Sequence, residues 1–204
     1  MGTSIIHPTA NIGKGTVVEN FCIIGENVTI GTNSKIRAGT HIYKNNKIGN
    51  NFQTGNKANI RENNKIGNNV SIGTLSVIEH NVIIEDNVRI HTQVFIPEFS
   101  TLKKGCWLGP NVVLTNAFHP LCPDVKNCLQ GPTIEEGAKI GANTTIMPAV
   151  TIGKNALIGA GSLVTKNVKA NKVAIGNPAK EIKDVKDLKC HYGRRKKPYE
   201  NTTR

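Results

Sequence analysis

Residues 24–36 read IGENVTIGTNSKI, with an isoleucine at the first, seventh and thirteenth positions of the stretch. Stepping by six in both directions gives nineteen positions from Ile6 to Leu114, of which eighteen are Ile, Val or Leu. The spacing resumes after a break and runs from Ile134 to Val164. Residues six apart drift off any one face of an α-helix, which repeats about every 3.6 residues. The stripe therefore predicts an all-β repeat.

A second stripe lies two residues before the first and consists mostly of small or β-branched residues, such as Val28 before Ile30. Glycine often follows the aliphatic residue, as Gly31 does, and we expect glycine and asparagine in these turns to adopt positive φ. Each hexad then supplies one short strand and one turn, and three hexads close a triangular coil. The twenty-five hexads predict about eight stacked coils, a column roughly 40 Å tall at about 4.8 Å per coil.

The composition agrees with a narrow core. The chain has 204 residues, only 4% aromatic residues and a single Trp, whereas its 38% apolar content is too high for a disordered chain. No apolar run is long enough to span a bilayer, and the first residues lack the features of a secretory signal. We therefore expect a soluble cytoplasmic protein that does not bind membranes.

The charge is strongly positive. Lys and Arg number 26 and Asp and Glu number 14, which gives a formal net charge of +12 and suggests an anionic partner. The basic run at residues 189–197 is interpreted as a solvated tail, since no aromatic or helical recognition element accompanies it, and we expect no nucleic-acid binding. Five cysteines make a disulfide framework improbable, and Cys22 and Cys106 fall on the small-residue stripe as packing residues.

The hexads resemble the left-handed parallel β-helix of the bacterial hexapeptide-repeat acyltransferases over about residues 4–180. The handedness comes from this resemblance, because crossovers between parallel strands are generally right-handed. The resemblance also implies a homotrimer, and triangular columns pack well side by side. We expect a β-helix domain at residues 1–180 and a basic extension at 181–204, in which residues 182–189 form a short helix that caps the open end.

Four inward positions depart from the pattern. Asn46, Phe52, Thr54 and Asn64 are larger or more polar than the stripe requires, so we expect distorted or bulged coils around residues 44–65. A contact with substrate is the alternative explanation for these residues.

The break in the repeat is a nineteen-residue segment, residues 115–133. Structureless segments of this length are usually functional or disordered. Its apolar residues predict that it protrudes and docks on a neighbouring face, such as that of a neighbouring subunit. Within it, His119 is the best candidate for a general base, because a neutral imidazole accepts a proton near pH 7. The alternative is a histidine that is simply solvated in a loop.

Two resemblances assign chemistry to this segment. The residues His119, Pro120 and Leu121 and the return through residues 132–134 resemble the loop of the maltose and galactoside O-acetyltransferases, which implies that His119 is the base. Residues 109–116 resemble the nucleotide-sugar N-acetyltransferases that act on UDP-linked amino sugars, which implies that Asn116 lies in the active site. The sequence departs from that second group in having His119 where asparagine is usual.

The hexads after Ile134 are the most regular in the chain, and their small residues leave a flat face for a pantetheine arm. The segments 164–168 and 176–180 resemble the coenzyme A end of the superfamily. Together these features predict that acetyl-CoA is bound by Gly141, Ala142, Gly159, Ala160, Thr165, Lys166 and Lys180.

The sequence thus predicts an acetyl-CoA-dependent sugar acetyltransferase, with N-acetylation of a nucleotide-linked amino sugar placed first. The alternatives are O-acetylation of a free sugar hydroxyl and a non-catalytic β-helix scaffold. No activated nucleophile is evident, so we expect direct transfer. We expect no metal, because His119, Cys122 and Cys128 match no strong zinc spacing and the other histidines lack the close pair of a γ-class carbonic anhydrase site.

Overall fold

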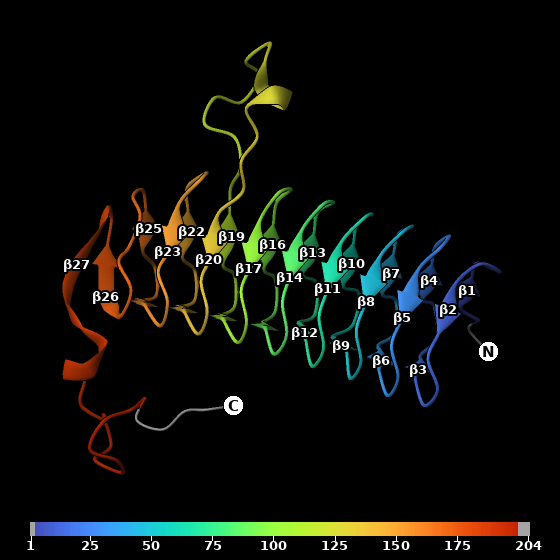
Figure 1. The fold of residues 1–204 in the computed structure, drawn as a ribbon, viewed down its shortest axis with the longest axis horizontal. Coiled ribbons are helices and arrows are strands. Elements are labelled where there is room, and N and C mark those ends of the chain that lie inside the picture. The colour runs from blue at the N-terminus through green and yellow to red at the C-terminus, as the bar shows by residue number, and fades with distance from the viewer. Residues whose placement is uncertain (1–2, 200–204) are drawn as a thin grey trace.

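The computed structural model describes residues 3–199 and is an all-β, left-handed parallel β-helix of three sheets (Figure 1). Sheet A contains β1 (Ile5–Ile6), β4 (Ile23–Ile24), β7 (His41–Ile42), β10 (Asn59–Ile60), β13 (Val77–Ile78), β16 (Phe95–Ile96), β19 (Val113–Leu114), β22 (Thr145–Ile146) and β25 (Leu163–Val164). Sheet B contains β2 (Asn11–Ile12), β5 (Thr29–Ile30), β8 (Lys47–Ile48), β11 (Lys65–Ile66), β14 (Ile83–Ile84), β17 (Thr101–Leu102), β20 (Thr133–Ile134) and β23 (Thr151–Ile152). Sheet C contains β3 (Val17–Val18), β6 (Lys35–Ile36), β9 (Gln53–Thr54), β12 (Ser71–Ile72), β15 (Arg89–Ile90), β18 (Trp107–Leu108), β21 (Lys139–Ile140), β24 (Leu157–Ile158), β26 (Lys172–Gly176) and β27 (Ala179–Asp184).

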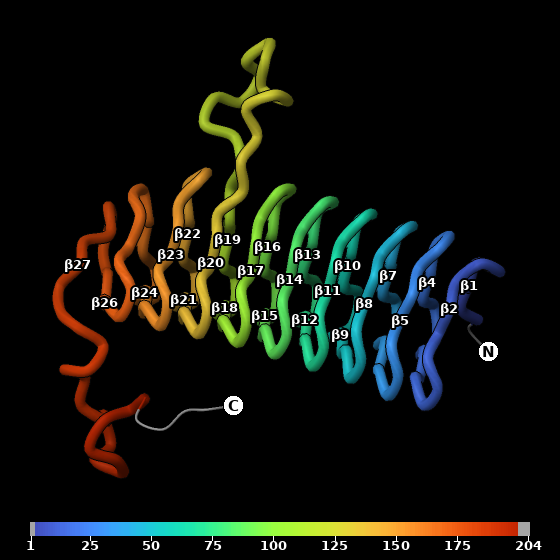
Figure 2. Tube along the Cα trace, in the orientation of Figure 1, coloured from blue at the N-terminus to red at the C-terminus, as the bar shows by residue number. Residues whose placement is uncertain are grey.

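Each coil passes through sheets A, B and C in turn, and a strand pairs in parallel with its counterpart one coil away, as Ile60 pairs with Ile78. Figure 2 shows how closely each coil repeats the one before it. Sheet A has nine strands among the described residues, so the column contains about nine coils rather than eight. The last coil is completed by β26, which lies outside the hexad register and pairs with β24. Below, the C-terminal end of the column is called its top.

The two stripes form the core as predicted. The inward aliphatic residues are buried from Ile24 to Val164, and the small residues beside them, including Cys22 and Cys106, are buried as well. Ile6 and Ile12 are less covered because they lie in the first coil, which no coil covers from below. The column thus buries one aliphatic side chain on nearly every strand, and Phe52 is the one aromatic side chain in the core of the described residues.

The expectation of positive φ at the glycines after the aliphatic residues is wrong. Gly31 has an ordinary φ, and a Cβ there would lie 2.6 Å from the backbone nitrogen of Asn50 in the next coil. Glycine is therefore required by the close approach of stacked coils. Positive φ falls two residues later, where Asn33 has φ of 55°. Asparagine tolerates that conformation better than most residues with a side chain.

The two inward asparagines do not cause the expected distortion around residues 44–65, because their amides are hydrogen bonded. Asn46 donates from Nδ2 to the carbonyl oxygens of Tyr43 and Arg61, both at 2.7 Å, and its Oδ1 accepts from the backbone of Asn64 at 3.0 Å. Asn64 in turn accepts from the backbone N–H of Val82 at 2.7 Å. The side-chain amides of Asn46 and Asn64 therefore serve as hydrogen-bond partners for buried backbone groups. The strand register continues through β8, β10 and β11.

Of the other two residues, Phe52 is packed in the core and Thr54 causes a local irregularity. Phe52 is fully buried, and the Thr54 hydroxyl accepts a hydrogen bond from the backbone N–H of Arg37 at 2.9 Å. That hydroxyl takes the place of a backbone acceptor, so the pairing of β6 with β9 is reduced to Lys35 with Gln53.

The expected helix over residues 182–189 is replaced by a β-hairpin. Residues up to Asp184 belong to β27, which pairs antiparallel with β26 and with it closes the top of the column. The hairpin is held by an ion pair between Lys172 and Asp184. Helical structure in this region is one 3-10 turn, η2 (Val185–Asp187). Within residues 3–199 the helical segments are three-residue 3-10 turns, too short to cross a bilayer.

Candidate active site

The segment between β19 and β20 protrudes from the column (Figure 1). It contains the 3-10 turn η1 (Val125–Asn127) and is closed at its base, where the carbonyl oxygen of Asn116 accepts a hydrogen bond from Gln130 at 2.9 Å. Two of its large apolar residues do not dock on their own chain, since Leu121 is 97% exposed and Phe118 is 55% exposed. The segment thus leaves an apolar surface uncovered, and docking on a neighbouring subunit stays a prediction.

His119 lies in this protruding segment, beyond its closed base. Its carbonyl oxygen accepts a hydrogen bond from the N–H of Cys122 at 3.2 Å, and its side chain is exposed. Within one chain, the described residues contain no hydrogen bond between the side chains of His119 and Asn116.

Asn116 belongs to a column of side chains at the corner where sheet A passes into sheet B, which we call the A/B corner. Successive coils put side chains at the same place on this corner, each two residues after the inward residue of a sheet A strand. From bottom to top the members with ionisable or amide side chains are Glu26, Lys44, Glu62, His80, Glu98, Asn116 and Lys166. The fold therefore brings Asn116 and Lys166 within two coils of each other, roughly 10 Å.

The side chains around Asn116 form a chain of polar contacts. Asn116 donates from Nδ2 to Oε2 of Glu98 at 3.4 Å, and Oε1 of Glu98 lies 2.6 Å from Nε2 of His80. The other ring nitrogen, Nδ1, is buried without a hydrogen bond, 3.7 Å from Oε2 of Glu79. The imidazole therefore lies between two carboxylates. The side chains of His80 and Glu98 are 30% and 20% exposed to solvent.

Further down the corner, Arg61 is held by carboxylates and by an aromatic ring. It donates to Glu62 at 2.9 Å and to Glu79 at 3.4 Å, and its guanidinium lies 5.3 Å from the centre of the Tyr43 ring. The hydrogen bond from Arg61 lowers the pKa of Glu62 below its ordinary value, so that Glu62 is ionised at neutral pH. The buried amide of Asn46 fixes the backbone beneath this group.

Sequence patterns did not single out Glu98 and His80. Their spacing could have identified them, because three hexads make one coil and residues 18 apart therefore stack on each other. Counting back by 18 from Asn116 leads to Glu98, His80 and Glu62 in turn.

The residues predicted to bind acetyl-CoA divide between two corners. Thr165 and Lys166 follow β25 on the A/B corner. The others lie at the corner where sheet C passes into sheet A, or on the hairpin beside it: Gly141, Ala142, Gly159, Ala160 and Lys180. The two groups border opposite edges of the top of sheet A.

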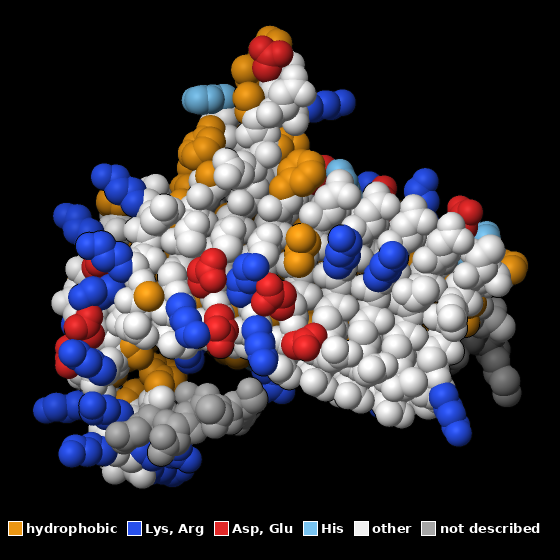
Figure 3. Space-filling view, viewed as in Figure 1, with side chains coloured by type: hydrophobic (Ala, Val, Ile, Leu, Met, Phe, Trp, Pro, Cys, Tyr) orange, Lys and Arg blue, Asp and Glu red, His pale blue; other side chains and the backbone are white. Residues whose placement is uncertain are grey.

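Local contacts distinguish these residues further. A Cβ on Gly141 would overlap the backbone nitrogen of Ala160, so coil stacking by itself requires this glycine. The N–H groups of Ala142 and Ala160 donate no backbone hydrogen bond in the described part of the chain. Lys166 and Lys180 make no ion pair with any described residue. Figure 3 shows Lys and Arg side chains gathered towards this end of the molecule.

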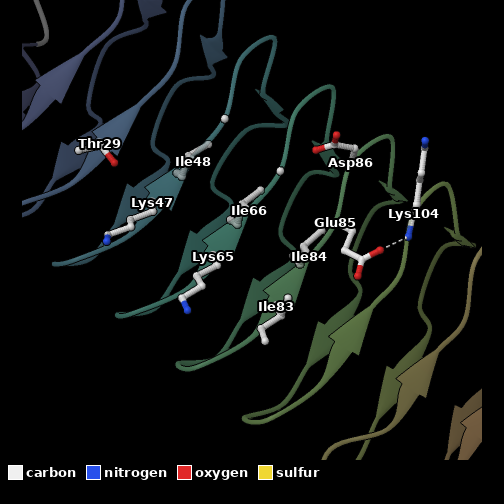
Figure 4. A pocket seen from close by; sticks show the side chains of 12 residues that line it. Thr29, Lys47, Ile48, Lys65, Ile66, Ile83, Ile84, Glu85, Asp86 and Lys104 are labelled. Carbon is white, nitrogen blue, oxygen red and sulfur yellow. Dashed lines mark hydrogen bonds between the residues drawn. The ribbon is translucent and has the colours of Figure 1, made fainter.

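A shallow depression of about 650 Å³ lies elsewhere, on the outer face of sheet B. Figure 4 shows Lys47 and Lys65 projecting from β8 and β11 there, and Glu85 accepting the backbone N–H of Lys104. None of the predicted site residues lines it, and the side chains with acid–base chemistry lie at the A/B corner instead. Residues 3–199 contain no group of three or more His, Cys, Asp or Glu side chains that could hold a metal ion.

A family model for the bacterial transferase hexapeptide (six repeats) matches residues 9–44, 65–98 and 131–166, just over half of the chain. Among curated proteins, the galactoside O-acetyltransferase of Lactococcus lactis is 42% identical over 85 residues, which cover 39% of this chain and 40% of that protein. The galactoside O-acetyltransferase of Escherichia coli is 38% identical over 96 residues, 45% of this chain and 47% of that protein. The matches therefore span less than half the length of these relatives.

Among solved structures, the UDP-N-acetylglucosamine acyltransferase of Francisella novicida superposes with a TM-score of 0.62. It is 22% identical, and the superposition covers 89% of this chain and 68% of that chain. At this level of identity the similarity shows a common fold.

Proposed function

Because the chain belongs to the bacterial transferase hexapeptide family, we propose that it is an acetyl-CoA-dependent sugar acetyltransferase whose acceptor is a nucleotide-linked amino sugar. The observation that carries the proposal is the arrangement at the A/B corner. The protruding segment with His119 leaves the column at Asn116, and Lys166 lies two coils above Asn116 on the same corner. A residue predicted to contact the acceptor and a basic residue suited to a phosphate thus lie on the same corner, at the base of the segment that carries His119.

In the proposed reaction the acceptor amine attacks the thioester carbonyl carbon directly. The new N–C bond forms as the C–S bond breaks, one proton leaves the nitrogen for the imidazole of His119, and the coenzyme A thiolate takes that proton. Asn116 orients the acceptor. The unpaired N–H groups of Ala142 and Ala160 are available to line the donor groove and to stabilise negative charge on the thioester oxygen. Lys166 and Lys180 would pair with phosphates of coenzyme A.

The charge at the A/B corner favours an amine acceptor. The formal net charge of the chain is +12, yet Glu98, Glu79 and Glu62 gather below Asn116 with Arg61. Carboxylates attract an ammonium group, which releases one proton to solvent before the neutral amine attacks, and do nothing comparable for a neutral hydroxyl.

O-acetylation of a sugar hydroxyl is the second candidate. It is favoured by the two relatives, which are both galactoside O-acetyltransferases at about 40% identity. A hydroxyl must lose its proton as it attacks, and the exposed imidazole of His119 is suited to that role.

We further propose a homotrimer that works in the cytoplasm. Ile23, Phe95 and Val113 project from the outer face of sheet A and are each more than a third exposed. The donor residues border two edges of that sheet, so a second subunit is needed to close a groove between them. The uncovered apolar residues Phe118 and Leu121 offer a contact for such a neighbour.

Mass spectrometry of products from a panel of UDP- and dTDP-linked amino sugars and free galactosides, each incubated with acetyl-CoA, tests the proposal. We expect a mass gain of one acetyl group on a nucleotide-linked amino sugar. A gain on galactosides alone would establish the second candidate. Coenzyme A should also raise the melting temperature by mass action. A protein that neither acetylates any acceptor nor gains stability with coenzyme A is a scaffold.

A further inference from the structure

The amide of Asn116 is oriented by its neighbour. Its Nδ2 faces Oε2 of Glu98 at 3.4 Å. An ionised carboxylate only accepts hydrogen bonds, whereas a primary amide has one donating end and one accepting end. Glu98 therefore attracts the NH2 end of the amide, and the oxygen Oδ1 points away from it. Within the described residues Oδ1 of Asn116 makes no hydrogen bond.

Glu98 is in turn held by His80. Oε1 of Glu98 lies 2.6 Å from Nε2 of His80, and the ring of His80 is bounded on its other side by Glu79. The side chains of His80, Glu98 and Asn116 come from three successive coils, so the stacking of the column fixes their separation.

We infer that His80 and Glu98 are positioning residues that act through Asn116 by keeping its Oδ1 turned towards the acceptor. There Oδ1 accepts a hydrogen bond from the attacking group. The inference rests on the proposed function, because it takes Asn116 as the residue that contacts the acceptor.

This orientation favours an amine. A neutral primary amine has two N–H groups and a lone pair, so it donates one hydrogen bond to Asn116 while the lone pair attacks and the second N–H faces His119. A hydroxyl has a single O–H, which cannot be given to a base and to Asn116 at the same time. The amide held by Glu98 thus favours acceptors that can donate to Oδ1 and still face a base with a second N–H, as a primary amine does.

An exchange of the two partners tests the inference. In Asn116→Asp two carboxylates face each other, and we expect kcat/KM for the amino sugar to fall about a hundredfold, the range of a lost hydrogen bond to a charged group. In the double variant E98Q/N116D, the side chain at position 98 again has a hydrogen-bonding group complementary to the one at position 116. The amide introduced at position 98 then donates to the carboxylate introduced at position 116 and accepts from His80, while the free oxygen of that carboxylate faces the acceptor. We expect E98Q/N116D to be at least about tenfold more active than N116D.

The matched control is Glu85→Gln in the N116D background. Glu85 lies at another corner, where it accepts the backbone N–H of Lys104 and pairs with Lys103. We expect this change to leave the activity of N116D unaltered within about twofold. If E98Q fails to raise the activity of N116D beyond the control, Glu98 does not act through Asn116 and the inference is wrong.

A second measurement does not depend on activity. The side-chain NH2 signal of Asn116, identified by its loss in N116D, should lie downfield in a ¹⁵N-resolved NMR spectrum because of its carboxylate partner. It should move upfield in E98Q and stay in place in E85Q. A signal that E98Q leaves unmoved overturns the inference. If the wild-type protein acetylates no acceptor while the signal moves, the proposed function fails and the orientation of the amide stands.

Discussion

Glu98 lies one coil above His80 on the same corner of the column, with its Oε1 2.6 Å from Nε2 of His80. Glu98 also accepts a hydrogen bond from Asn116, which stands at the base of the protruding segment. An imidazole, a carboxylate and an amide are thus joined directly below the segment that carries the histidine predicted to be the base. The residues follow three strands, β13, β16 and β19, and no local motif connects them.

Replacing His119 with Ala should lower kcat for acetyl transfer about a hundredfold or more, since general base catalysis contributes roughly 10²–10⁴-fold. The melting temperature should stay unchanged, because the His119 side chain is exposed. His7→Ala, at an exposed position near the first strand, is the matched control. Transfer that stays within a few-fold of wild type for every acceptor would show that His119 is not the base.

Replacing Lys166 with Ala should weaken coenzyme A binding roughly tenfold or more, as expected for one lost hydrogen bond between charged groups. Isothermal titration calorimetry measures the change directly. Lys47→Ala, on the outer face of sheet B, removes the same charge far from the predicted groove and should leave the affinity unaltered. Equal losses in the two variants would mean that net charge, and no specific contact, governs binding.

Replacing Asn64 with Ala should lower the free energy of unfolding by about 1–3 kcal/mol, because it leaves a buried donor without a partner. That donor is the backbone N–H of Val82, which Asn64 accepts at 2.7 Å. Urea unfolding compares this variant with Gln53→Ala, an exposed position on β9 where about 0.5 kcal/mol or less is expected. Similar stabilities for the two variants would contradict a structural role for the buried amide.

Replacing Gly73 with Ala should destabilise the column by about 1–3 kcal/mol or more, as overpacking does. A Cβ there would overlap the carbonyl carbon of His91 in the next coil, and that backbone cannot yield without separating the coils. Asn69→Gly, at a position with φ of 56°, should cost less than about 1 kcal/mol, since glycine adopts this conformation readily. Thermal unfolding of both variants checks the contrast.

The sequence was a reliable guide where the repeat is local. The inward stripe, the small-residue stripe and the protruding segment after Leu114 were all identified from spacing, because in a solenoid the next neighbour in space is one coil away in sequence. The sequence was misleading at the glycines, because a glycine can serve either a positive φ or the close approach of another backbone. Gly31 was expected to supply positive φ, but it is required by the backbone of the next coil.

The sequence predicted the residues of the candidate site less completely than it predicted the fold. Asn116 and His119 were recognised from motifs, whereas His80 and Glu98 were missed, since each looks like an ordinary polar turn residue within its own hexad. Asn46 and Asn64 were expected to distort the coils, because the sequence does not show that their amides meet the backbone of the next turn.

By itself the sequence determined that the chain forms coils with one aliphatic residue per strand inside, because burying that stripe requires a period of six. The tertiary structure decided which polar side chains share a corner and which groups they face. Coil stacking brings residues 18 apart into contact, and the direction of each side chain depends on its partner above and below. The protruding segment likewise could be located from the broken period, but that two of its large apolar residues stay uncovered on their own chain is visible only in the folded molecule.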